Sequence, residues 1–152
     1  MILNILIIII SGVAATSAMA LFMDQLSKKN IANANMVKAL GTIFTKNQSE
    51  GYSLGLKLHY IAGVIIAFVY AALISLFTPS LYAGYVGLGA MVGLFHGFAF
   101  SFLLVIAVAE HHPIEEFRTA GFGVALAHLA GHIVYGLVLG AVIGLFRIKF
   151  LF

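Results

Sequence analysis

The chain has 152 residues, of which 62% are apolar and 9% are charged, whereas a soluble domain carries about 25% charged residues. Eight basic and five acidic residues cannot cover the surface of a soluble protein of this length, so the composition predicts an integral membrane protein. The sequence has no cysteine, which excludes disulfides and thiolate metal sites, and its net charge of +3 is spread along the chain without the basic patch of a nucleic-acid-binding protein.

Four apolar runs are long enough to cross the hydrocarbon core of a membrane as helices, which takes about 20 residues. None of them alternates polar and apolar residues as a transmembrane strand does. We therefore predict an all-α, polytopic membrane protein, with a four-transmembrane-helix bundle as its single domain over residues 1–152. The runs are 5–23, 58–77, 81–109 and 120–146, within helices expected over about 3–26, 54–78, 81–110 and 114–148.

The first run also resembles a signal peptide, because Ala18-Met19-Ala20 fits the small-residue pattern of a cleavage site. However, no Lys or Arg precedes the apolar stretch, as the basic start of a signal peptide would require. We therefore expect this segment to be retained as the first membrane helix.

The polar segment between the first two spans, residues 24–55, contains an amphipathic stretch over about 33–46. Apolar residues recur there at the spacing of one helix face, which predicts a helix lying along the membrane interface. Such a helix could dock a partner, but a surface anchor is the simpler interpretation. The apolar face holds Met36, Val37, Leu40, Ile43 and Phe44, and the polar face holds Lys38, Thr42, Thr45 and Lys46.

The topology follows from one turn and from the basic residues. Thr78-Pro79-Ser80 predicts a tight turn, so we expect the second and third spans to be antiparallel neighbours. Because cytoplasmic loops carry an excess of Lys and Arg, the larger basic group predicts that loops 25–55 and 110–118 are cytoplasmic and that both termini lie outside a bacterial inner (plasma) membrane. That group is Lys28, Lys29, Lys38, Lys46, Lys57 and Arg118; Arg147, Lys149 and the amino terminus lie on the other side.

Glycine recurs at every fourth position in the last two spans, which is an extended form of the GxxxG pattern. Such a stripe lets the backbones of two helices approach closely. The two stripes could pack against each other within the chain, or they could join the chain to a second copy or to a larger membrane complex. They are Gly89, Gly93 and Gly97 in the third span and Gly136, Gly140 and Gly144 in the fourth.

Histidines occupy the same faces as these glycines. In steps of four towards the amino terminus, the stripe of the fourth span reaches His132 and His128, and His96 lies beside the stripe of the third. His96 precedes Ala109 by thirteen positions and His132 follows Thr119 by thirteen, so both lie roughly 20 Å from the same membrane face, near the midplane. His128 lies about one helical turn nearer that face. We therefore expect three imidazoles to converge between antiparallel helices.

Ionisable residues inside a membrane are costly and are candidates for function. Neutral imidazole ligates transition metals and haem iron, so these three histidines could hold a copper, iron or zinc ion. Alternatively, His96 and His132 could bind a haem b from opposite sides. In a third interpretation the histidines only hydrogen-bond across helices, to Tyr70, Tyr135 or Ser101, and hold the bundle together.

A second group of candidate ligands lies at the cytoplasmic boundary. Carboxylates and imidazoles there could form a metal site of the carboxylate–histidine type, although their spacing matches no ferritin-like box. Glu115 and Glu116 follow Pro113 and are better explained as acidic residues at the positive N-terminal end of a helix. The candidate metal ligands are His59, Glu110, His111 and His112.

The sequence leaves three hypotheses for function. The first is a small membrane protein that binds a haem or transition-metal cofactor through intramembrane histidines, in electron transfer or metal handling. The second is a non-catalytic accessory or assembly subunit of a larger membrane complex, suggested by the glycine stripes and the small mass outside the membrane. The third is a proton or metal-ion conduit, in which the outer histidines pass the ion to the deeper ones. No motif assigns a catalytic residue, since the glycines after Thr119 lack the GK[ST] of a P-loop and follow no strand.

Overall fold

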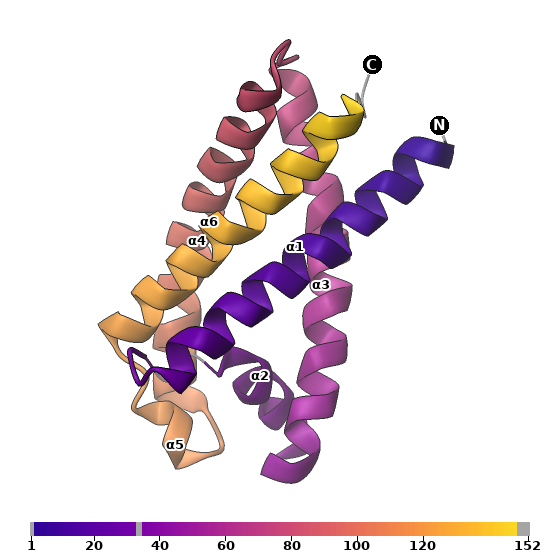
Figure 1. Cartoon of the computed structure of the whole chain (residues 1–152). Helices are drawn as coiled ribbons and strands as arrows, with labels where there is room; N and C mark the ends of the chain where they lie inside the picture. The colour runs from indigo at the N-terminus through magenta and orange to yellow at the C-terminus, as the bar shows by residue number, and fades with distance from the viewer. Residues whose placement is uncertain (1, 33–34, 149–152) are drawn as a thin grey trace.

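The computed structural model describes residues 2–32 and 35–148, which form six α-helices and no strand. Four of the helices are long and apolar enough to cross a membrane, which confirms the all-helical class and agrees with the number of spans predicted. The start of the first helix and the end of the last lie at the same end of the molecule, and the two short helices lie at the other (Figure 1). The helices are α1 (Ile2–Lys28), α2 (Met36–Thr45), α3 (Gln48–Leu76), α4 (Tyr82–His111), α5 (Glu115–Arg118) and α6 (Phe122–Phe146).

The helix boundaries differ from the expectation at two places. α3 begins at Gln48, before the expected position 54, because the side chain of Asn47 accepts a hydrogen bond from the Ser49 amide and so caps the helix. The span expected from 114 is divided into α5 and α6, which are separated by Thr119 and an extended Gly121. Of the other expected features, residues 33–34 of the amphipathic segment and Lys149 lie outside the described residues.

The glycine stripes of α4 and α6 pack against each other within the chain, and this is the most extensive helix contact in the fold. A Cβ atom on Gly89 would collide with the carbonyl oxygen of Gly136, and one on Gly136 would collide with that of Gly89. Gly140 meets the backbone of Tyr85 in the same way. Because these faces are covered inside one chain, the accessory-subunit hypothesis loses the argument from the glycine stripes.

The expected pairing of the second and third spans is present only in part. The connection between α3 and α4 is short, but the two helices contact each other much less than α4 contacts α6. α3 packs mainly on α1 and α2, and α1 in turn packs on α6 (Figure 1). α3 and α4 therefore leave room between them along part of their length.

Helix α2 packs on the first turns of α3 through small residues. A Cβ on Gly41 would collide with the carbonyl oxygen of Gly51, and one on Gly55 would collide with that of Val37. Thr42, which we expected on the polar face towards water, is fully buried. Burial is tolerated because its hydroxyl donates to the carbonyl oxygens of its own helix. α2 thus has a small-residue face against the protein as well as the exposed Phe44.

The contact between α4 and α6 can be tested with Gly136→Ala. The added methyl group would meet backbone rather than a flexible side chain, so we expect the free energy of unfolding to fall by about 1–3 kcal/mol. The measurement is the heat-unfolding midpoint in detergent. Gly87→Ala is the matched control, because no atom lies within 4 Å of a Cβ at that exposed position of α4. An equal effect of the two changes would contradict the packing described here.

Candidate functional site

His96 of α4 and His132 of α6 are brought into ring contact by the glycines around them. A Cβ on Gly93 would collide with the carbonyl oxygen of His132, and one on Gly97 would lie 2.8 Å from the His132 Cβ. The ring centroids of the two histidines are 4.5 Å apart, with 49° between the ring planes. On its other side, His96 Nδ1 lies 3.0 Å from the hydroxyl of Tyr70 in α3.

The spacing of these two rings can be compared with the spacing that each cofactor expected from the sequence would require. A metal–imidazole bond is about 2 Å long, so two imidazoles on opposite faces of a haem iron have centroids roughly 6 Å apart. Two imidazoles on one tetrahedral ion have centroids roughly 5 Å apart. The observed 4.5 Å leaves no space for a porphyrin between the rings and is close to the value for a shared ion.

His128 lies one turn before His132 and has one ring nitrogen without a partner. Its Nδ1 is 2.8 Å from the carbonyl oxygen of Val124. Because a carbonyl can only accept, Nδ1 carries the proton and Nε2 keeps a lone pair in the neutral ring. Nε2 is buried and has no hydrogen-bond partner among the described residues. A cavity of about 30 Å³ beside the ring could hold one water molecule, so Nε2 is available to water or to a metal ion.

His59, which the sequence placed in the outer group, lies deep in the molecule. It follows the first residue of α3 by eleven positions, which is roughly 17 Å along the helix. It lines a cavity of about 290 Å³ together with His96 and His132, which we call the histidine cavity. The missed signal was Asn47 with Glu50 three residues later, a pattern that marks a helix start and would have moved His59 away from the boundary.

A larger cavity of about 620 Å³ lies between the histidine cavity and the end of the molecule that holds α2. The two cavities share Met19 and His59 in their walls. Towards α2 the lining becomes polar and charged, with an ion pair of 2.6 Å between Asp24 and Lys28. We call this the α2-side cavity; among its lining residues are Asp24, Lys28, Asn35, Tyr52, His59 and His128.

The other residues of the expected outer site, Glu110, His111 and His112, line neither of these two cavities. His111 and Glu110 form an exposed pair, 3.9 Å apart. His112 is buried, and both of its ring nitrogens are occupied: Nδ1 accepts from the Ile114 amide, so Nε2 carries the proton and donates to the Ala39 carbonyl oxygen at 3.0 Å. His112 therefore ties α2 to the turn after α4 and has no lone pair left for a metal.

The described residues contain no group of three or more His, Asp or Glu side chains already arranged to hold a metal ion. His96 and His132 are the two described histidines whose rings are in contact. Ser101, one of the expected hydrogen-bond partners, is buried and bonds to none of the described residues. A third ligand for an ion at His96 and His132 would have to come from rotation of His59 or His128.

Comparisons of the sequence with protein-family models, curated proteins and solved structures gave no match. The function must therefore be argued from the geometry of this site.

The assignment of His112 can be tested by its replacement. We expect His112→Ala to lower the free energy of unfolding by about 1–3 kcal/mol, because it removes one of the donors to the Ala39 carbonyl oxygen and leaves the Ile114 amide without its side-chain partner. Faster tryptic cleavage after Lys46 would report the release of α2. His111→Ala is the control, since that side chain is 78% exposed. Identical behaviour of the two variants would show that His112 does not hold α2.

Proposed function

We propose that the protein binds a transition-metal ion inside the membrane through the imidazoles of His96 and His132, in metal handling or electron transfer. The observation that carries the proposal is the 4.5 Å between the two ring centroids at the wall of the histidine cavity. His59 lines the same cavity and His128 lies one turn away from His132 on α6, so a rotated side chain of either would supply a third ligand. Copper, iron or zinc would suit a site built of neutral imidazoles.

The hydrogen bonds of the histidines support this proposal. Histidines that ligate metals usually donate their second ring nitrogen to a backbone carbonyl or another polar group, which fixes the orientation of the ring. His128 has this arrangement through Val124, with a buried Nε2 that lacks a partner. Tyr70 occupies the corresponding position behind His96. If the histidines served only to hold the helices together, we would expect each buried ring nitrogen to have a hydrogen-bond partner, and Nε2 of His128 has none among the described residues.

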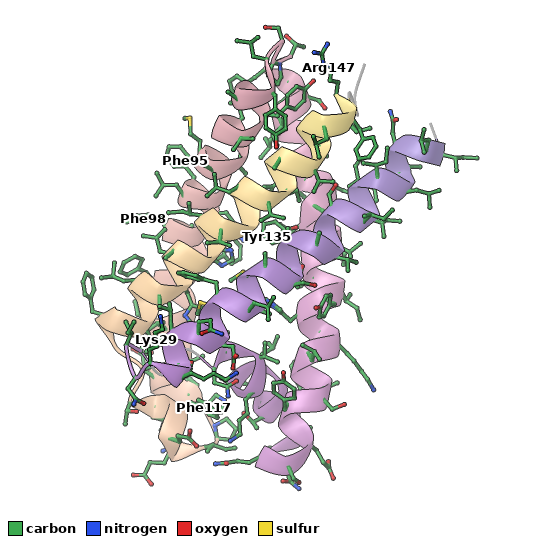
Figure 2. All side chains as sticks on the ribbon, in the orientation of Figure 1. Lys29, Phe95, Phe98, Phe117, Tyr135 and Arg147 are labelled. Carbon is green, nitrogen blue, oxygen red and sulfur yellow. The ribbon has the colours of Figure 1, made fainter. Side chains whose placement is uncertain are left out.

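The α2-side cavity provides a route for an ion from one membrane face. The basic residues gather at this end: Lys29 lies near α2 and α5, whereas Arg147 lies at the opposite end (Figure 2). By the excess of basic residues, the α2 end is cytoplasmic and both termini are outside. In this arrangement the four long helices form a bundle across the membrane, and α2 lies at the cytoplasmic interface with Phe44 towards the lipid.

A conduit through the whole membrane is the second candidate, because the two cavities adjoin each other at His59 and Met19, which line both. The half of the molecule beyond the histidine cavity is closed, however. Ile74, Leu139 and Ile143 are each 0% exposed there and form part of a packed apolar core. A binding site reached from one face therefore agrees better with the structure than a continuous path.

We expect the purified chain to bind one Zn²⁺ or Cu⁺ ion, and His96→Ala or His132→Ala to weaken this binding by about a hundredfold, at the upper end of the effect of losing a supporting group. The measurement is titration in detergent, with elemental analysis after gel filtration. His111→Ala is the control, because its exposed ring lies outside both cavities.

Two outcomes would change the proposal. If the unaltered chain binds neither ion, the metal site is refuted. If Zn²⁺ crosses liposome membranes containing the chain, and His132→Ala abolishes that flux, the conduit replaces the binding site as the proposed function.

Tyr70→Phe tests the residue behind His96 without touching a ligand. We expect metal affinity to fall by about tenfold, because the ring of His96 loses the hydrogen bond at Nδ1 that orients it. Tyr135→Phe is the matched control: this buried tyrosine donates its hydroxyl to the Gly63 carbonyl oxygen at 2.6 Å rather than to a histidine. We expect that change to lower stability and to leave metal affinity unaltered; the opposite pattern would exclude Tyr70 as an orienting residue.

A further inference from the structure

The histidine cavity opens sideways between α3 and α4. Ala62 of α3 and Phe100 of α4 both line the cavity, yet both side chains are exposed at the surface. Phe100 precedes the last residue of α4 by eleven positions, so it lies roughly 17 Å from that helix end. An exposed side chain at this depth of a membrane-spanning helix faces acyl chains rather than water. The opening therefore leads into the lipid.

The lining combines an apolar wall with a few hydrogen-bonding groups. Most of the wall is aliphatic or aromatic, with Met19, Ile66 and Phe100 among its residues. The hydroxyl protons of Thr16 and Tyr135 are already donated to backbone carbonyl oxygens of Gly12 and Gly63.

The imidazoles of His59 and His132 are different, since neither makes a hydrogen bond with the residues that the structure describes. A neutral imidazole has one N–H donor and one lone pair. Donors for a hydrogen-bond acceptor thus line the cavity from α3 and α6.

We propose that this cavity binds the head group of a lipid-soluble carbonyl compound of the quinone class, which enters from the bilayer between α3 and α4. The carbonyl oxygens of such a ring would accept from the N–H groups of His59 and His132. Phe100 offers an aromatic surface for the flat ring and already packs edge-on against His96, with centroids 4.7 Å apart.

The volume of the cavity agrees with this occupant. Sites for small molecules usually span about 300–1,000 Å³, so a cavity of about 290 Å³ suits a single ring with its substituents but not a long tail. The apolar tail would leave through the opening and lie among the acyl chains. Such a ring could bind with or without the metal ion, because a neutral imidazole has one N–H donor in either case and keeps it when its other nitrogen ligates a metal.

The absence of tryptophan from the sequence allows a direct test. Phe100→Trp places one indole at the opening, and Phe98→Trp places one on a lipid-facing part of the same helix, where the side chain points away from the other helices (Figure 2). A short-tailed benzoquinone quenches indole fluorescence on contact. With a chelator present, we expect saturable quenching of the Phe100→Trp variant and only a linear, partition-type decrease in the Phe98→Trp variant.

His132→Ala in the Phe100→Trp background should weaken the saturable quenching by about tenfold, as expected for one lost hydrogen bond. Linear quenching of equal slope in both tryptophan variants would overturn the proposal and leave partition into detergent as the explanation. The unaltered chain provides a second measurement. The benzoquinone should raise its heat-unfolding midpoint, whereas an alcohol with the same tail should not.

The outcome separates the two proposals for this cavity. Saturable quenching under chelation, in a chain that binds neither Zn²⁺ nor Cu⁺, would support the lipid-soluble ligand and refute the metal site. Metal binding with no saturable quenching and no rise in the midpoint would refute the lipid-soluble ligand alone.

Discussion

Backbone contact between α4 and α6 is the constraint on which the rest of the structure depends. Lipid tails are as apolar as the side chains of a membrane helix, so helix association in a bilayer depends on close packing rather than on the hydrophobic effect. Glycines such as Gly89 and Gly136 remove the side chains that would hold the two backbones apart. The same register places His96 opposite His132, because each histidine continues or adjoins the stripe of its own helix. The contact between the His96 and His132 rings is thus a consequence of the helix packing that holds the fold together.

The close pairing of α4 with α6 also determines where the cavity lies. α4 packs closely along α6, whereas α3 packs mainly on α1 and α2. The hydroxyl of Tyr70 lies 3.0 Å from His96 Nδ1, and this hydrogen bond bridges α3 and α4 near the middle of the fold. Below this bridge, on the α2 side, the helices diverge and His59 enters the space between them. The histidine cavity is therefore a result of an incomplete contact between α3 and α4.

Hydrogen bonding at both ring nitrogens separates structural histidines from available ones. His112 is almost completely buried, as is His128, and burial alone would rank the two alike. His112 uses both nitrogens, one on the Ile114 amide and one on the Ala39 carbonyl oxygen, so it serves only to join helices. His128 uses one nitrogen and leaves the other as a buried lone pair. A desolvated lone pair without a donor is costly, which is why such an atom points to a ligand more strongly than depth in the membrane does.

The sequence by itself determined the helical class, the four spans and the matched depth of His96 and His132, because these depend on composition, run length and a rise per residue that is the same in every helix. It did not determine which partner each glycine stripe takes, since a smooth helix face fits any other smooth face. The position of His59 was missed because an apolar run marks the hydrocarbon core and not the helix start, which Asn47 sets three turns earlier. Only the tertiary structure decided that both ring nitrogens of His112 have hydrogen-bond partners and that Nε2 of His128 has none among the described residues. Those properties depend on carbonyl and amide groups of other segments, whose positions no residue pattern records.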